Sequence, residues 1–211
     1  MTSIVPSSSS KSSLAARTWA YHQQLLESEH ALAYLSSRQI TKEAIEAFRL
    51  GYVGSPSSGD EHYRGRIAIP YLTTTGPVSI RFRRIGDGEG AKILSEHGDS
   101  GRPYNVAALS GSDQPVYITE GELDAISMWI AGLPAVAFPG AKSWLPVFGR
   151  LFRMREVVIV ADGDDPGLAF AHRAATDLEQ YRIIQCPHGE DANSILIEGG
   201  PEALRKLVGR G

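Results

Sequence analysis

An apolar run that ends in three carboxylates is the feature of this sequence that most restricts its fold. Residues 157–161 read Val-Val-Ile-Val-Ala and are followed at once by Asp162, Gly163, Asp164 and Asp165. A continuous β-branched run predicts a strand buried on both faces, which is typical of a parallel sheet covered by helices. Open sheets of this kind place their ligands at the carboxyl ends of the strands. The acidic residues are therefore expected at a ligand-binding edge.

Two interpretations of this acidic turn stay open on the residues alone. Carboxylates that lie close together repel each other, and a hard divalent cation bound through oxygen, above all Mg²⁺, would offset the repulsion between Asp162 and Asp164. The alternative is a solvated turn in which Asp165 is the N-cap of the next helix and Pro166 lies just inside that helix.

The carboxyl-terminal half of the chain alternates strand patterns with helical patterns. The strand patterns are Val116–Thr119, Ala135–Phe138, Val157–Ala161 and Tyr181–Gln185. Such alternation predicts an α/β fold, a parallel sheet with flanking helices. The expected domain spans residues 113–211.

The amino-terminal half is expected to form a smaller, basic α+β subdomain over residues 14–112. Its pattern is helical from Leu14 to about Phe48, and strands are predicted at Arg66–Leu72 and Pro77–Ile85. The serine-rich start, residues 1–13, is expected to be disordered.

Composition excludes several classes of protein. The single cysteine, Cys186, excludes an internal disulfide and a multi-cysteine zinc ribbon, so no zinc is expected. No run of about 18 apolar residues is present, so we expect a cytosolic protein without a membrane partner. The net charge of −3 does not indicate a nucleic-acid binder, although the distribution of charge matters more than its sum.

Further carboxylates follow the other predicted strands. Glu120 ends the first of them, Asp124 lies in the first turn of the next helix, and Asp191 follows the last strand, while Glu122 is expected to be a solvated first-turn acid. The functional interpretation is a Mg²⁺ site in which Glu120 helps to handle a proton. The alternative is that these acids only cap successive helices.

This ordered pair of motifs resembles the Toprim fold. The pair is Ile118-Thr119-Glu120-Gly121 and Ala161-Asp162-Gly163-Asp164. Residues 33–52, the strand Arg64–Pro70, the segment Lys92–Ser95 and the loop Pro187–Asp191 are similar, in the same order, to the polymerase core of bacterial DnaG-type primases. The resemblance covers residues 31–207 and implies metal-dependent nucleotidyl transfer.

A basic segment agrees with that resemblance. Residues 64–85 hold five arginines and no acid: Arg64, Arg66, Arg81, Arg83 and Arg84. Strand alternation places Arg64 with Arg66 and Arg81 with Arg83, while Val78, Ile80 and Phe82 point the other way. We therefore predict a basic surface over an apolar core that binds template, primer or nucleotide phosphates, with Lys92 as a further phosphate contact. A solvated outer strand face is the alternative.

Two departures from the primase pattern shape the expectation. DnaG-type primases usually add a zinc-binding module and a helicase-docking domain. The chain is therefore expected to be a minimal polymerase core of a kind that would suit a phage. A replicative helicase and a separate zinc-binding subunit are its possible partners. The final acidic loop usually offers two aspartates, whereas this chain has Asp191 and then Asn193, so a second metal site there is expected to be weaker.

The sequence thus predicts a DNA primase, a DNA-directed RNA polymerase that makes short RNA primers from ribonucleoside triphosphates on single-stranded DNA. The predicted catalytic residues are Glu120, Asp162 and Asp164, which together with Asp124 and Asp191 would hold Mg²⁺ or Mn²⁺. The alternatives are a Toprim-type nuclease and a non-catalytic DNA-binding protein of replication or recombination.

Overall fold

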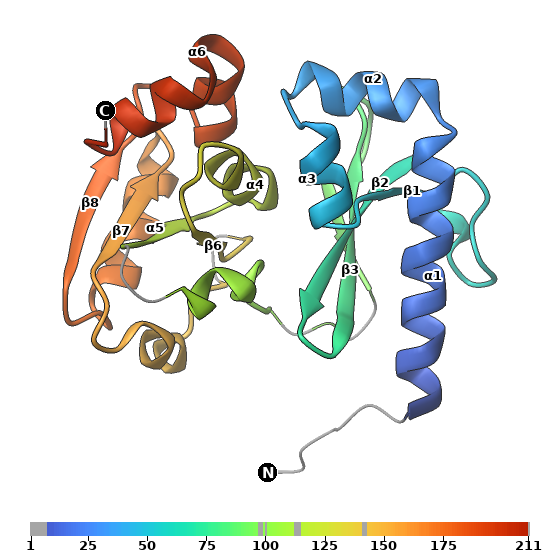
Figure 1. The fold of residues 1–211 in the computed structure, drawn as a ribbon, viewed down its shortest axis with the longest axis horizontal. Coiled ribbons are helices and arrows are strands. Elements are labelled where there is room, and N and C mark those ends of the chain that lie inside the picture. The colour runs from blue at the N-terminus through green and yellow to red at the C-terminus, as the bar shows by residue number, and fades with distance from the viewer. Residues whose placement is uncertain (1–7, 97–98, 100, 112–114, 141–142, 211) are drawn as a thin grey trace. The chain divides into compact units, whose positions relative to one another are not determined.

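The computed structural model describes residues 8–96, 99, 101–111, 115–140 and 143–210. The chain divides into two compact units, the first formed by residues up to Ser36 and by Lys42–Asp99, the second by Ser37–Thr41 and the residues from Ser100 onward. Over the described residues each unit has its own four-stranded sheet (Figure 1). The short segment Ser37–Thr41 therefore belongs with a sheet that begins almost 80 residues later in the sequence.

Three helices open the first unit: α1 (Ser8–Leu26), α2 (Glu29–Ser37) and α3 (Lys42–Ala47). Disorder was predicted up to residue 13, but α1 already begins at Ser8, while residues 1–7 lie outside the described part. Serine and lysine each cost at most about 0.7 kcal/mol relative to alanine inside a helix. A helix that is anchored from Leu14, which packs against the core, can therefore extend backwards through the serine run.

The first sheet is antiparallel. Its strands are β1 (Gly51–Tyr52), β2 (Arg66–Thr73), β3 (Gly76–Arg84) and β4 (Ile93–Ser95), in the order β1-β2-β3-β4, with the short 3-10 helix η1 (Glu61–Tyr63) before β2. Helix α1 packs against β1, β2 and β3. The core beneath it contains Tyr21, Ala68, Ile80 and Phe82, all fully or almost fully buried.

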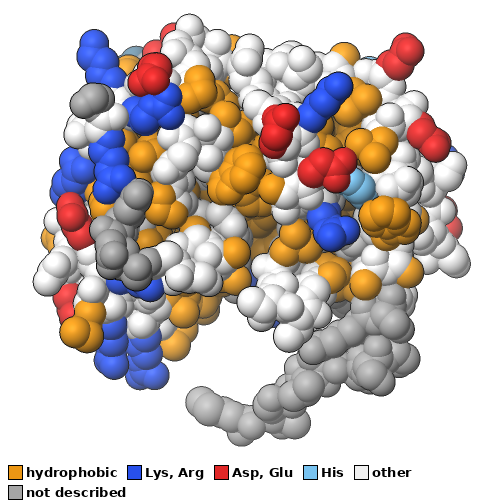
Figure 2. Space-filling view, in the orientation of Figure 1, with side chains coloured by type: hydrophobic (Ala, Val, Ile, Leu, Met, Phe, Trp, Pro, Cys, Tyr) orange, Lys and Arg blue, Asp and Glu red, His pale blue; other side chains and the backbone are white. Residues whose placement is uncertain are grey.

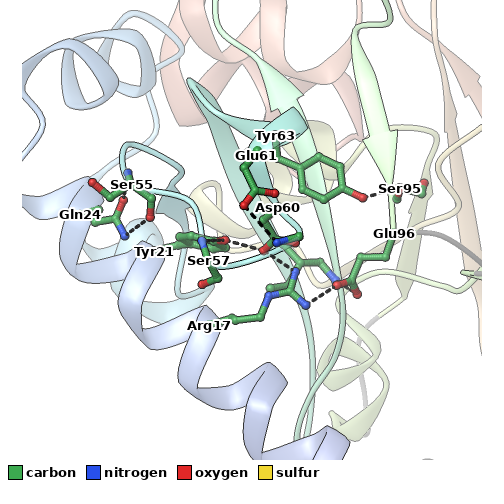
Figure 3. A network of polar contacts seen from close by, with 12 residues as sticks. Arg17, Tyr21, Gln24, Ser55, Ser57, Asp60, Glu61, Tyr63, Ser95 and Glu96 are labelled. Atoms are coloured by element: carbon green, nitrogen blue, oxygen red, sulfur yellow. Dashed lines mark hydrogen bonds and ion pairs between the residues drawn. The ribbon is translucent and has the colours of Figure 1, made fainter.

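A network of polar contacts fastens α1 to the loop before β2 (Figure 3). Arg17 forms ion pairs of 2.8 Å with both Asp60 and Glu96. The hydroxyl of Tyr21 donates to Asp60 over 2.5 Å and accepts from the backbone N–H of Ser57 over 3.1 Å. Because Asp60 is only 7% exposed, the contacts compensate a carboxylate that has lost most of its water.

The second unit is the α/β part predicted from the sequence. Its elements are η2 (Val106–Ser110), β5 (Val116–Thr119), α4 (Glu122–Ile130), β6 (Ala135–Ala137), η3 (Pro146–Phe152), β7 (Val157–Ala161), α5 (Asp165–Ala175), β8 (Tyr181–Gln185) and α6 (Ala192–Leu207). The strands pair in parallel in the order β6-β5-β7-β8. The predicted fold class, a parallel sheet with flanking helices after a smaller α+β part, is confirmed.

Burial in this unit explains the apolar run at residues 157–161. Every residue of β5 and β7 is buried, because helices cover both faces of these central strands. Helix α5 and η3 contribute to the core on one face, where Phe152 and Phe170 belong to the same buried cluster as Ile159, while α4 and α6 contact each other. Strand β8 has a neighbour on one side, β7, and its side chains are exposed or half-buried.

Charge is unevenly distributed over the surface. Figure 2 shows basic side chains gathered over the region of β8 and α6 in that view, and Arg205 and Lys206 lie in the last turn of α6. A small net negative charge therefore coexists with locally basic surface. Among the residues that the structure describes, none of the helices combines the length and hydropathy needed to cross a membrane.

Candidate active site

The carboxyl edge of the parallel sheet carries the predicted acidic residues. Glu120 directly follows β5, Asp162 directly follows β7, and Asp191 comes after β8 as the N-cap of α6. Since β5, β7 and β8 are parallel neighbours, their carboxyl ends meet at one edge. Strands that are far apart in the sequence thereby deliver three carboxylates to a single region.

Two of the aspartates are helix caps. Asp164 is the N-cap of α5 and its Oδ1 accepts from the backbone N–H of Gly167 over 2.7 Å. The prediction that Asp165 would be the cap was wrong: Asp164 has the extended backbone of a cap, whereas Asp165 already belongs to the helix. Asp191 forms a capping box with Ser194, each side chain bonding the other residue's backbone N–H, over 2.7 and 2.9 Å.

The two acidic loops are joined through the glycine between Asp162 and Asp164. The backbone N–H of Gly163 donates to the carbonyl of Glu190 over 2.7 Å, and the N–H of Gly189 donates to the carbonyl of Gly163 over 2.9 Å. A Cβ at position 163 would overlap the carbonyl oxygen of Pro187. Only glycine therefore allows the loops after β7 and β8 to approach this closely.

Asp162 is a strongly perturbed carboxyl of the site. Burial, followed by the charges of Asp124, Glu120, Asp191 and Asp164, raises its pKa from 3.8 to about 8. The four acids that act on it are the other four members of the predicted ligand set. The arrangement therefore concentrates negative charge around Asp162, as a cation-binding site requires.

Glu120 supplies an oxygen without a protein partner. Burial and then the charge of Asp164 raise its pKa, while Arg173 lowers it. Its Oε1 is buried and has no hydrogen-bond partner among the residues that the structure describes. An unsatisfied buried carboxylate oxygen costs free energy unless a proton, an ion or a substrate group binds it.

The first turn of α4 is more buried than the sequence suggested. Asp124 is 7% exposed, and its Oδ1 accepts from the backbone N–H of Asn193 over 3.0 Å. Glu122, expected to be solvated, is only 2% exposed. The burial of Tyr104, followed by the charge of Glu122, raises the pKa of Tyr104 well above the usual range. A glutamate in a first helical turn is commonly exposed, so local pattern carried no signal of this burial.

The donor set fits a hard divalent cation. Within the described ranges, no three His, Cys, Asp or Glu side chains already stand in the arrangement of a metal cage. Even so, all five predicted ligands are carboxylates, which have two oxygens each, so a capping carboxylate can also bind an ion. The crowding around Asp162 and the unpartnered oxygen of Glu120 are both relieved by such an ion. Cys186 is a poor competitor, since burial and the nearby acids raise the pKa of its thiol to about 12.

The prediction that the arginines of the first unit form one basic surface was wrong for Arg66 and Arg83, which lie on opposite faces of the sheet. The register of β2 and β3 pairs Arg66 with Arg84 and Ile67 with Arg83. Opposite residues share a face and neighbouring residues alternate, so Arg66 lies on the face of Phe82, whereas Arg83 lies on the other. Periodicity reveals the alternation within one strand, but the parity between two strands depends on their register.

The basic side chains also differ in their surroundings. Arg83 is 8% exposed and donates to the hydroxyl of Tyr34 over 2.9 Å. Arg66 donates to the carbonyl of Ala91 over 3.0 Å, and burial followed by the charge of Arg84 lowers its pKa. The remaining predicted contacts are the exposed Arg64 and Lys92 and the half-buried Arg81, whose guanidinium lies 5.6 Å from the ring centre of Tyr71.

Comparison with known proteins agrees with this architecture. A family model described as Toprim-like matches residues 117–196. The gene 57 protein of Mycobacterium phage D29 is 44% identical over 152 residues, which represent 69% of this chain and 99% of the phage protein. The DNA primase of Myxococcus xanthus is 27% identical over 230 residues, covering 86% of this chain and 38% of that primase. The chain belongs to the DnaG-type primase family, with a Toprim domain.

Solved structures show the same fold. The RNA polymerase domain of the Mycobacterium tuberculosis primase DnaG superposes with a TM-score of 0.77 at 24% identity, covering 97% of this chain and 84% of that domain. At this identity the likeness establishes the fold. This DnaG-type chain spans about two-fifths of the length of the bacterial primases that it matches, and the Toprim-like match lies wholly inside the second unit.

Proposed function

We propose that the chain is a DNA primase, a DNA-directed RNA polymerase that makes short RNA primers from ribonucleoside triphosphates on a single-stranded DNA template. The observation that carries the proposal is the acidic edge of a parallel sheet, formed by Glu120, Asp162 and Asp164, in a chain of the DnaG-type family. A DNA template is supported by a crystal structure of the M. tuberculosis DnaG RNA polymerase domain with a double-stranded DNA oligomer that has a 6-nucleotide overhang.

In this proposal the five carboxylates hold Mg²⁺ or Mn²⁺. The ligand set is Glu120, Asp124, Asp162, Asp164 and Asp191. Such an ion, when bound, neutralises phosphate charge and makes the primer 3′-hydroxyl more acidic. Glu120 accepts the hydroxyl proton at its unpartnered Oε1, since its raised pKa favours proton uptake. The interlocked loops around Gly163 hold Asp162 and Asp164 rigidly, so little reorganisation accompanies the reaction.

The basic residues of the first unit position the nucleic acid or the nucleotide. The predicted contacts are Arg64, Arg66, Arg81, Arg83 and Lys92. Exposure favours Arg64 and Lys92 as direct phosphate contacts. Arg83, bonded to Tyr34 and almost buried, orients α2 on the sheet and reaches a ligand only if that contact opens. A Lys92→Ala variant is expected to weaken DNA binding and to reduce its salt dependence by about one counterion.

Primer synthesis tests the proposed function. The assay supplies single-stranded DNA, a labelled ribonucleoside triphosphate and Mg²⁺ or Mn²⁺, and compares wild type with an Asp162→Asn/Asp164→Asn variant. We expect template-directed primers from wild type and a loss of at least about 10³-fold in the variant. Equal product from both proteins would contradict the assignment of the site.

The same assay separates the alternatives. Degradation of the DNA without any need for nucleotide would indicate a nuclease, and metal-independent DNA binding without either reaction would indicate a non-catalytic protein. Because the chain spans 38% of the Myxococcus primase, the assay is repeated with an added zinc-binding module and a replicative helicase. Synthesis only in their presence would identify them as required partners.

A further inference from the structure

Asn193 stands at the centre of a buried group of hydrogen bonds beside the acidic edge. It lies in the first turn of α6, which contacts α4 (Figure 1). Its side-chain amide donates to the hydroxyl of Ser127 and to the carbonyl of Arg38, both over 2.9 Å, and its backbone N–H donates to Asp124 over 3.0 Å. We call these four residues the Asn193 clamp. All of them belong to the second unit.

The direction of every bond in the clamp is determined by its partners. The hydroxyl of Ser127 donates to the carbonyl of Leu123 over 2.8 Å, so its oxygen is left to accept. The carbonyl of Arg38 can only accept. Residue 193 must therefore donate two N–H bonds from its side chain, which an asparagine does and an ionised aspartate cannot do.

Burial makes this requirement strict. Asn193 is 2% exposed and Ser127 is fully buried, so water cannot replace a lost partner. The amide oxygen of Asn193 also faces the guanidinium of Arg38, at 3.5 Å. With its donors and its oxygen directed at protein groups, the side chain does not present an oxygen to an ion at the acidic edge.

We infer that Asn193 is a positioning residue that orients the carboxylate of Asp124 and ties the segment Ser37–Thr41 to the acidic edge, and that it is not a metal ligand. The part of the inference that concerns Asp124 rests on the proposed function, in which Asp124 is a metal ligand. It replaces the expectation, drawn from the sequence, of a weak second metal site at Asn193. The hydrogen-bond acceptors around position 193 require an amide there, which explains why this chain has Asn193 where the family usually has a second aspartate.

An Asn193→Asp variant tests the clamp against a ligand role. In EDTA at pH 8, the clamp predicts that the melting temperature falls by roughly 5–10 °C, because two buried acceptors lose their donors and face a carboxylate. Titration with Mn²⁺, followed by electron paramagnetic resonance, should show no additional bound ion. The control is Gln185→Glu, which adds the same charge at the exposed carboxyl end of β8 and should leave the melting temperature nearly unchanged. An unchanged melting temperature together with an additional Mn²⁺ ion would overturn the inference.

A second variant decides the matter if Asn193→Asp does not fold. Ser127→Ala removes one acceptor of the clamp without adding charge, and the fully buried hydroxyl of Ser127 is already bonded to Leu123 and Asn193. The positioning role predicts a three- to tenfold weaker Mn²⁺ affinity with unchanged stoichiometry, which a purely structural residue would not cause. Unchanged affinity would overturn the role. If Asp162→Asn/Asp164→Asn also leaves Mn²⁺ binding unchanged, the proposed metal site fails, whereas the melting temperatures in EDTA still test the clamp.

Discussion

Replacing Asp162 by asparagine should stabilise the metal-free protein. The pKa of Asp162 is raised from 3.8 to about 8, so the folded state keeps a proton that the unfolded chain releases above pH 4. Stability attributable to this group is therefore present at acid pH and is lost as the pH rises through about 8. At 1.36 kcal/mol per pH unit, the interval from 3.8 to about 8 corresponds to roughly 6 kcal/mol as an upper limit. Five carboxylates share the repulsion, so we expect Asp162→Asn to raise the free energy of unfolding by about 1–3 kcal/mol at pH 8.

Denaturation in urea at several pH values measures this effect. In EDTA, the difference between variant and wild type should be close to zero at pH 4, grow with pH and level off above pH 8. Mg²⁺ or Mn²⁺ should stabilise wild type by an amount that grows with the logarithm of the ion concentration above the dissociation constant, and should stabilise the variant much less. Asp165→Asn serves as the control, because Asp165 is an exposed acid in the first turn of α5 and is not among the charges that raise the pKa of Asp162. A variant that is less stable than wild type at pH 8 in EDTA would refute the reasoning.

Three further predictions concern the close glycine, the buried ion pair and the thiol. Gly163→Ala should lower the free energy of unfolding by about 2–4 kcal/mol in urea, because its Cβ would overlap the Pro187 carbonyl oxygen. Gly111→Ala, whose Cβ would meet no atom of the described residues within 4 Å, should have little effect. A tolerated Gly163→Ala would contradict the close approach. Asp60→Ala should lower the free energy of unfolding by about 2–4 kcal/mol, because Arg17 loses one of its two carboxylate partners and keeps only Glu96. A loss below about 0.5 kcal/mol would show that the ion pair is effectively solvated. Cys186 should react with a disulfide reagent at pH 8 at least about a hundredfold more slowly in the native than in the unfolded protein, given its raised pKa and burial; equal rates would show that the thiol is accessible.

Local pattern was sufficient for the elements of the second unit. Strands β7 and β8 have the predicted bounds, because an apolar run between turn-forming residues is specified by its own neighbours. The cap of α5 was misplaced by one residue, since Asp164 and Asp165 are both good caps and only their backbone angles distinguish them. Burial of Glu122 could not be predicted, because it depends on tertiary packing, and a glutamate in a first helical turn gives no local sign of it.

By itself, the sequence determined that parallel strands end in carboxylates at one edge, since strand type and chain direction follow from local residues. Only the tertiary structure decided how those carboxylates are used. Whether Arg66 and Arg83 share a face depends on the register between two strands. Whether position 193 must be an amide depends on Ser127 and Arg38, 66 and 155 residues away. Hydrogen-bond polarity and close packing act between segments that meet only in the folded chain, and this is why local pattern could not reveal them.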